Sequence, residues 1–205
     1  MKKVVFLITV AAMAAVSVCA FGQELKVKMG ANKKHGFVDK RGKMVISYLY
    51  DYAWEFSEEL AAVCIDNKWG FIDKKGEAAI PFKYDYAWVF SDGLAAVKLN
   101  KKWGYIDQTD KEVIPFKYDD AETFSEGLAC VKLNNKWGFI DQTGKEAIPF
   151  KYEKVWSFSN GVAAVKLNAK WGMIDQTGVV VIPLEYENAS DASAAYTEMI
   201  SRCEP

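Results

Sequence analysis

A Trp-Gly dipeptide recurs at a fixed spacing along this chain and constrains its fold more than any other feature. The four intact copies are Trp69-Gly70, Trp103-Gly104, Trp137-Gly138 and Trp171-Gly172. Each tryptophan lies 34 positions after the previous one, and an altered fifth copy, His35-Gly36, lies one period before the first. Self-similarity at one period indicates that a supersecondary unit is repeated in tandem. The sequence therefore predicts five units of about 34 residues.

Within each unit, two short β-runs are separated by a tight turn. In the fourth unit, Leu128 to Leu133 and Lys136 to Asp141 are rich in apolar residues and flank Asn134-Asn135. Asn tolerates the positive φ that a type I′ turn requires, and two such residues between apolar runs predict a β-hairpin. The same slot begins with Asn or Asp in every unit, so we expect a hairpin in each.

The third hairpin indicates which residues face one another. With the Asn-Lys pair as the turn, Lys98 lies opposite Trp103, and Val97 lies opposite Gly104. One face of the hairpin then belongs to the apolar core. Trp103 and Tyr105 lie on the other face, and we expect the neighbouring link to cover about half of that face. Gly104 allows another backbone to approach closely, as an isolated strand glycine often does.

After the hairpin, each unit is predicted to continue through a turn, a third strand and a link. Most second strands end in Asp-x-x-Gly, as at Asp141 to Gly144, which signals a type I turn; the third unit has Asp110 instead of glycine. A short strand such as Glu112 to Ile114 follows, and Pro115 then marks a strand end or an edge. A Tyr-Asp-x-Ala-x-x-Phe-Ser-x-Gly link, as at Tyr84 to Gly93, completes a three-stranded meander.

The repeats define the domain organisation and the fold class. Residues 23–186 form the array, residues 1–22 precede it, and residues 187–205 form a C-terminal cap or tail. Three strands per unit are too few for a propeller blade of about four. We therefore predict an all-β tandem array of meander units in an open, elongated stack, rather than a closed propeller.

The two ends of the array depart from the repeat pattern, as terminal units often do. In the first copy, His35 replaces Trp and Ser47 replaces Pro. After the last copy, Asp191 to Arg202 is rich in alanine, with Ser190 or Asp191 as the N-cap. This segment predicts a short helix that covers the final edge strand.

Residues 1–22 have the layout of a secretory signal peptide. Two lysines precede an apolar run ending at Val18, which is too short and wrongly flanked for a membrane-spanning helix. Cleavage after Gly22 is favoured over cleavage after Ala20. Cys19 suggests a lipoprotein anchor, which the bulky Val18 before it disfavours. We expect an exported protein that is periplasmic, outer-membrane associated or secreted.

Composition and pattern argue against several function classes. Without Lys2 and Lys3, the chain has 24 basic and 27 acidic residues. It therefore has no excess of positive charge that would indicate nucleic-acid binding. No second long apolar run occurs, so we expect no membrane span. His35 is the only histidine, which rules out a histidine metal cluster. No nucleophile motif with an activating base occurs, so we expect no enzymatic activity, cofactor or metal site.

The repeated aspartates and the cysteines have structural explanations. One aspartate per unit begins the turn after the second strand: Asp39, Asp73, Asp107, Asp141 and Asp175. Calcium needs about six to eight converging oxygens, so a turn role is favoured over a calcium ladder. The three cysteines of the mature chain stand at unrelated positions of the repeat, and their odd number does not fit a disulfide framework. We expect Cys64, Cys130 and Cys203 to be unbridged and non-catalytic.

Together these motifs resemble a known bacterial repeat. Lys-Trp-Gly-Phe-Ile-Asp, a turn ending in Gly, Val-Ile-Pro, and the Tyr-Asp and Phe-Ser-x-Gly-Leu-Ala segments recur in that order. This order resembles the WG repeat, also called the KWG repeat, over about Leu25 to Tyr186. The resemblance implies β-structured modules of exported or envelope-associated proteins and no general enzymatic activity. His35 and Asp110 depart from the pattern, which bears on how those two units fold.

Aromatic side chains are the remaining candidates for binding. Trp54, Trp88 and Trp156 lie in the links, with Tyr84 and Tyr118 nearby. Such rings can stack on sugars or anchor a partner chain, although packing between units explains better why nearly every copy keeps them. The sequence predicts a non-enzymatic protein-binding or scaffolding module of the bacterial envelope. Glycan or peptidoglycan binding through the same residues is the alternative.

Overall fold

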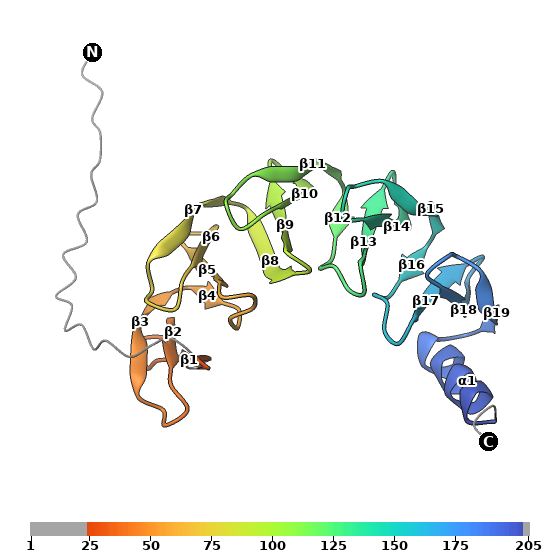
Figure 1. The fold of residues 1–205 in the computed structure, drawn as a ribbon, viewed down its shortest axis with the longest axis horizontal. Coiled ribbons are helices and arrows are strands. Elements are labelled where there is room, and N and C mark those ends of the chain that lie inside the picture. Colours follow the sequence, from red (N-terminus) through yellow and green to blue (C-terminus); the bar gives the residue numbers. More distant parts are fainter. Residues whose placement is uncertain (1–23, 203–205) are drawn as a thin grey trace, which may run out of the picture.

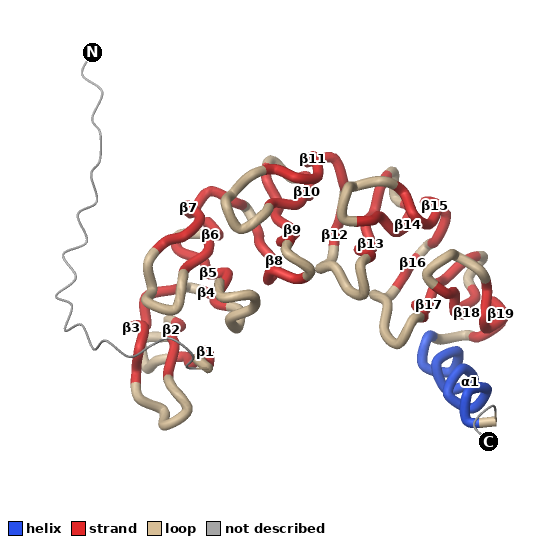
Figure 2. Tube along the Cα trace, in the orientation of Figure 1, coloured by secondary structure: helices blue, strands red, loops and turns tan. Residues whose placement is uncertain are grey.

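The computed structural model describes residues 24–202 as an open arc of small β-sheets (Figure 1). Five antiparallel sheets follow one another along the arc, and a helix stands at its C-terminal end (Figure 2). The two ends of the arc lie far apart, so the described array does not close on itself. The predicted all-β, open array of five units is confirmed. The predicted signal peptide, Cys19 and Cys203 lie outside the described residues.

The strands fall into five groups, which we call units 1 to 5. Unit 1 contains β1 (Lys26–Met29), β2 (His35–Val38) and β3 (Met44–Tyr50). Unit 2 contains β4 (Tyr52–Ala53), β5 (Ala61–Ile65), β6 (Lys68–Ile72) and β7 (Ala78–Tyr84). Unit 3 contains β8 (Tyr86–Ser91), β9 (Leu94–Leu99), β10 (Lys102–Ile106) and β11 (Glu112–Tyr118). Unit 4 contains β12 (Asp120–Ala121), β13 (Leu128–Leu133), β14 (Lys136–Asp141) and β15 (Glu146–Tyr152). Unit 5 contains β16 (Lys154–Val155), β17 (Val162–Leu167), β18 (Lys170–Asp175) and β19 (Val180–Tyr186).

Units 2 to 5 each have four strands, where the sequence predicted three-stranded meanders joined by links. The link supplies the extra strand. In unit 3, Tyr86 pairs with Lys98 and Ala87 with Val97, and Asp85 N donates to Lys98 O at 2.8 Å. The extra strand has only two residues in three of these units, too few to give a recognisable apolar period. Each link therefore belongs to the sheet that follows it.

The predicted hairpins and their register are confirmed. Lys98 pairs with Trp103, and the neighbouring pairs follow in step. The first turn residue in units 2 to 5 has the positive φ of a type I′ turn, for example 51° at Asn100. Unit 1 differs, because Gly30 N donates to Lys34 O at 2.8 Å and closes a longer loop.

Proline lies inside the outermost strand instead of closing it. β11 runs through Pro115 to Tyr118 and forms the edge of its sheet on the convex side of the arc (Figure 1). The predicted edge position is confirmed, and the predicted strand end is wrong, because an edge strand tolerates a residue without an N–H. The register between β10 and β11 shifts at Gly104. A Cβ on Gly104 would lie 2.7 Å from Ile114 O.

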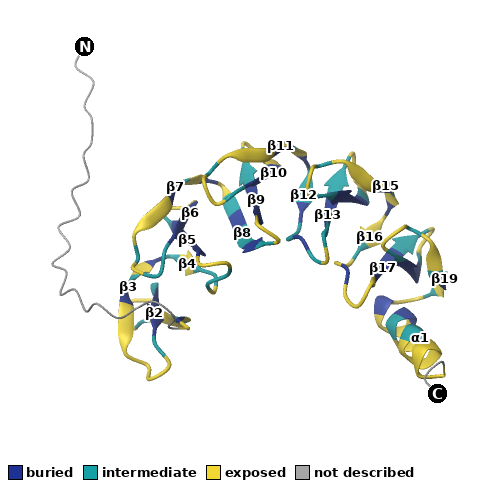
Figure 3. Ribbon diagram, viewed as in Figure 1, coloured by how far each residue is buried: buried dark blue, intermediate teal, exposed yellow. Residues whose placement is uncertain are grey.

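Both faces of each inner sheet are buried against neighbouring units. Tyr105 and Ala96 are fully buried on the face predicted to be half covered, and they pack with Phe124 of unit 4. Val97 on the opposite face packs with Phe71 of unit 2. The prediction of a half-covered face was wrong because a whole sheet, rather than a link, lies on it. Burial is thus concentrated between units, while the outer strands are exposed (Figure 3).

The loops between β4 and β5, β12 and β13, and β16 and β17 lie on the concave side of the arc (Figure 1), and hydrogen bonds from this part of the repeat join units 2, 3 and 4 to the unit that follows each. Serine hydroxyls donate to phenylalanine carbonyls 33 residues later: Ser57 to Phe90 at 2.7 Å, Ser91 to Phe124 at 2.8 Å, and Ser125 to Phe158 at 2.8 Å. Carboxylates accept from glycine backbone N–H groups 35 residues later: Glu58 from Gly93, Asp92 from Gly127, and Glu126 from Gly161. The Phe-Ser-x-Gly segment is therefore a joint between units, which explains its recurrence.

A helix closes the C-terminal end of the array. α1 (Ala189–Ser201) is capped by Asn188, whose side chain accepts from Asp191 N. The predicted N-caps, Ser190 and Asp191, lie inside the helix, because Asn188 stands one residue before its first turn and offers the same kind of oxygen. α1 packs on the face of unit 5 around Met173. It thus covers the face that a further unit would cover, not the edge strand alone.

The N-terminal end is closed by polar residues instead. Lys26 and Lys28 of β1 pair with the same positions of β2 that Ala61 and Val63 pair with in β6. Ala61 and Val63 are fully buried, whereas the two lysines are exposed. A polar outer face is what a terminal unit of a repeat array needs.

Candidate functional site

Six aromatic side chains form one continuous cluster, which we call the aromatic face. They are Tyr52, Trp54 and Trp69 of unit 2 and Tyr86, Trp88 and Trp103 of unit 3. The ring centroid of Trp69 lies 6.3 Å from that of Tyr52, 6.4 Å from Trp54 and 4.9 Å from Tyr86. Tyr86 continues the cluster to Trp88 at 5.2 Å and Trp103 at 5.7 Å. The rings thus form an unbroken row across two units.

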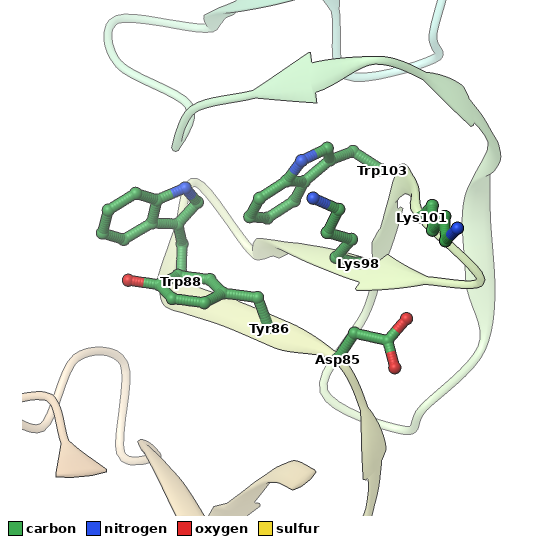
Figure 4. A pocket seen from close by; sticks show the side chains of 6 residues that line it. All are labelled: Asp85, Tyr86, Trp88, Lys98, Lys101 and Trp103. Atoms are coloured by element: carbon green, nitrogen blue, oxygen red, sulfur yellow. The ribbon is translucent and has the colours of Figure 1, made fainter. Parts of the chain in front are cut away.

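Strand alternation and register place these rings together. Tyr86 and Trp88 stand two apart on β8, so their side chains point to the same side. Tyr86 pairs with Lys98, which pairs with Trp103, and these three side chains form a row across the sheet (Figure 4). The same row in unit 2 consists of Tyr52, Cys64 and Trp69.

The link tryptophans are anchored to the following unit. Trp54 Nε1 donates to Ala87 O at 3.1 Å, and Trp88 Nε1 donates to Ala121 O at 3.0 Å. Both rings remain partly exposed. Each indole is therefore held in position at its polar edge while part of its apolar surface stays accessible.

Two hollows open beside these rings. One, of about 520 Å³, is lined by Asp85, Tyr86, Trp88, Lys98, Lys101 and Trp103 (Figure 4). The other, of about 390 Å³, is lined by His35, Tyr52, Ala53, Trp54, Cys64, Asn67 and Trp69, and shares Asp85 and Tyr86 with the first. Both volumes lie in the range of small-ligand sites.

Lys98, Asp85 and Cys64 determine the charge around the two hollows. Lys98 Nζ lies 5.7 Å from the ring centroid of Trp103, which is a cation–π contact. Asp85 accepts a hydrogen bond from Lys68 Nζ at 2.7 Å, and this bond holds the pKa of the Asp85 carboxyl below its ordinary value. Burial raises the pKa of the Cys64 thiol. Asp85 is therefore an anion at neutral pH, and Cys64 is an uncharged thiol.

The structure brings some of the predicted binding residues together and separates others. Trp54 and Trp88 lie in the aromatic face with ring centroids 5.3 Å apart. Trp156 is 51% exposed and lies near Trp171 in unit 5, away from that face. The remaining two, Tyr84 and Tyr118, are 2% and 1% exposed and belong to the core.

Sequence reasoning missed two members of the face, Tyr52 and Tyr86. Each stands two residues before a link tryptophan, so a Tyr-x-Trp alternation was visible in the sequence. The alternation carries meaning only once the link is recognised as a strand. Trp69 and Trp103 of the Trp-Gly marks are 6% exposed and pack between units, yet each also lines a hollow.

The aromatic face ends at unit 4. Asp120 and Glu122 stand where unit 3 has Tyr86 and Trp88. Burial, followed by the nearby charge of Asp120, raises the pKa of the Glu122 carboxyl. Glu122 has no indole N–H with which to reach the next unit as Trp54 and Trp88 do. The junction between units 4 and 5 therefore lacks the anchor found in the two preceding junctions.

We expect Glu122→Gln to raise the thermal midpoint by a few degrees at pH 8 and to have no effect near pH 4. A carboxyl whose pKa is raised by folding favours the folded state only while protonated, so its contribution is complete below its ordinary pKa of 4.5 and is lost as pH rises through the higher folded value. Scanning calorimetry across this pH range measures the difference. Glu146→Gln, on an exposed strand position, is the control, and an equal gain at pH 4 and pH 8 would contradict the expectation.

The aspartates and cysteines behave as structural residues. Asp141 Oδ1 accepts from Thr143 N at 2.9 Å and Lys145 N at 3.1 Å, and the other units repeat this turn, so the predicted turn role is confirmed. Residues 24–202 contain no group of three metal-ligating side chains. Cys64 and Cys130 are buried and unbridged, as predicted. No helix in the described part of the chain is long and apolar enough to span a membrane.

The geometry defines a class of protein: a tandem β-repeat array in which small sheets stack face to face. The chain belongs to the family of WG-containing repeats, whose model matches residues 36–69, 69–103, 103–137, 137–171 and 171–193. The predicted family resemblance is confirmed. No curated protein matches the chain by sequence.

Two solved structures share the arrangement of the sheets. A form of KlHsv2 with loop 6CD replaced by a Gly-Ser linker is similar with a TM-score of 0.52 and 7% identity, over 77% of this chain and 62% of that one. A eukaryotic initiation factor is similar with a TM-score of 0.50 and 11% identity, over 76% of this chain and 50% of that one. These likenesses concern the fold alone, and this chain spans less than two thirds of either protein.

Proposed function

We propose that this chain is an exported, non-enzymatic repeat protein of the bacterial envelope that binds another envelope protein through the aromatic face. The observation that carries the proposal is that several rings of the aromatic face are accessible to solvent. Tyr52 is 61% exposed, and Trp54, Tyr86 and Trp88 are partly exposed, with the indole N–H groups of both tryptophans anchored to the following unit. Aromatic side chains held rigidly at a surface supply large contact area with little loss of entropy, and they dominate the binding energy of protein interfaces.

The other parts of the proposal rest on residue chemistry. Export is supported by the short cationic start and apolar run of residues 1–22. A non-enzymatic role is supported by the cysteines, since burial raises the pKa of Cys64 and raises that of Cys130 to about 12, and a protonated thiol is a poor nucleophile. His35 Nδ1 lies 3.0 Å from Asp51 O and is thus engaged with backbone.

Glycan binding is the second candidate. The specific observation in its favour is that the two hollows combine ring surfaces with polar side chains such as Asp85, Asn67 and Lys101. A sugar offers an apolar ring face and hydroxyl groups that would match this combination.

Capture from envelope extract by the immobilised chain without residues 1–22 tests the proposal. We expect Tyr52→Ala to reduce capture of a protein partner by about tenfold, as for an aromatic residue central to an interface. Trp156→Ala is the matched control, because Trp156 is similarly exposed but lies outside the aromatic face. Equal capture by the wild type and Tyr52→Ala would refute the proposal. Tryptophan quenching by a glycan panel, lost in Tyr52→Ala, would favour the second candidate instead.

A further inference from the structure

One position of the repeat differs between units in a way that bears on ligand chemistry. The residue paired with the Trp of the Trp-Gly mark is lysine in units 3, 4 and 5: Lys98, Lys132 and Lys166. In unit 2 the residue paired with Trp69 is Cys64. In unit 3 the lysine ammonium lies over the indole, with Lys98 Nζ 5.7 Å from the Trp103 centroid. Unit 2 thus has the indole without the ammonium.

The hollow of about 390 Å³ lies at this position. Four rings of the aromatic face line it, from Tyr52, Trp54, Trp69 and Tyr86, together with His35. Asp85 is the carboxylate of the lining, and neither lysine nor arginine lines the hollow. In contrast, the hollow of unit 3 is lined by Lys98 and Lys101. Both hollows thus have aromatic walls and share Asp85, but only the hollow of unit 3 is lined by cations of the chain itself.

We propose that the hollow at Trp69 binds a quaternary or fully methylated ammonium group, whose charge replaces the lysine ammonium that the neighbouring unit supplies from its own chain. Aromatic rings around a cation are the arrangement by which proteins recognise such groups. This inference rests on the proposed function, because it assigns ligand chemistry to the aromatic face.

The lining favours a methylated ammonium over a primary one. A primary ammonium has three donors and needs matching acceptors. The lining offers mainly ring surfaces, and the Asp85 carboxylate already accepts from Lys68 at 2.7 Å. A methylated ammonium needs no acceptor, because its methyl groups pack against the rings and its charge is attracted by their faces.

Titration of the chain lacking residues 1–22 with tetramethylammonium, followed by tryptophan fluorescence and calorimetry, tests the inference. We expect saturable binding with one equivalent per chain. The uncharged isostere neopentane is too insoluble for this purpose, so choline and its neutral analogue 3,3-dimethylbutanol provide the charge comparison. The neutral analogue should bind roughly tenfold more weakly, since it lacks the cation–π attraction.

The repeat itself supplies matched variants. Cys64→Lys introduces the side chain that unit 3 carries, and we expect it to weaken binding at least about tenfold because its ammonium occupies the site. Cys64→Ala should retain binding. Lys98→Cys should create a second site, so that two equivalents bind. A thermal unfolding curve for each variant separates loss of binding from loss of fold, and Cys64→Ala shows whether the thiol itself matters.

Each outcome decides the inference. Equal binding of choline and its neutral analogue, equal binding by the wild type and Cys64→Lys, or no saturable signal from either cation would overturn it. Separate arms with free choline, phosphatidylcholine vesicles and a trimethyllysine peptide distinguish a solute, a lipid headgroup and a modified protein as the source of the group. If neither cation binds while Tyr52→Ala still fails to capture the protein partner, the inference is refuted and the proposed function stands.

Discussion

Replacement of Gly104 by alanine is expected to destabilise the protein by about 3 kcal/mol or more, and to do so through the backbone. A Cβ at this position would lie 2.7 Å from Ile114 O, 3.0 Å from Phe116 N and 3.1 Å from Phe116 Cα. These atoms belong to the neighbouring edge strand, so no side-chain rotation relieves the clash. The β10–β11 pairing would have to open at the shifted register that brings Ile114 close.

Gly93→Ala in the same unit is the matched control. Gly93 has a φ of +80°, and nothing lies within 4 Å of a Cβ built there. This substitution should cost only the left-handed backbone strain of a non-glycine residue, about 1 kcal/mol. Urea unfolding of both variants measures the difference. A similar cost for the two would mean that close approach does not explain the glycine of the Trp-Gly mark.

Tyr105→Ala is expected to have the second large effect, about 4 kcal/mol, because it empties the centre of an interface between units. Tyr105 is fully buried in the cluster shared by units 3 and 4, and its hydroxyl donates to Glu122 O at 2.8 Å. Tyr105→Phe keeps the ring and removes only the hydrogen bond, which should cost about 1 kcal/mol.

The loss at this interface should also change how the array unfolds. In a repeat array, each unit is stabilised by its own contacts and by those with its neighbours. Scanning calorimetry of Tyr105→Ala should therefore resolve two transitions, one for units 1 to 3 and one for units 4 and 5. A single transition at a lower temperature, with the Tyr105→Phe curve unchanged in shape, would indicate that cooperativity spreads beyond neighbouring units.

The architecture was largely predictable because the repeat supplies several copies of the same evidence. The Asn or Asp in each hairpin slot, the opposition of Lys98 and Trp103, and the edge position of Pro115 all follow from local backbone chemistry. Local rules suffice there, because each hairpin contact joins residues close in sequence.

The rest depends on contacts between units, which no single repeat contains. The link strand β8 exists because β9 offers it an unpaired edge, and Tyr105 is buried because unit 4 lies upon it. The binding site follows the same pattern. Trp54 and Trp88 were predicted as candidates, but Tyr84 and Tyr118 were grouped with them. Position along the chain does not distinguish the partly exposed tryptophans of the links from the core side chains that end β7 and β11.

The proline found in four of the five outer strands has a consequence for solubility. An uncovered edge strand is a template on which another chain can add, and a proline within it removes one of the N–H groups that such addition would use. β7, β11, β15 and β19 each carry this proline, whereas β3 has Ser47 at the corresponding position. β3 also exposes Met44, Val45 and Leu49. Among the convex edges of the five units, that of unit 1 is therefore the least protected against aggregation.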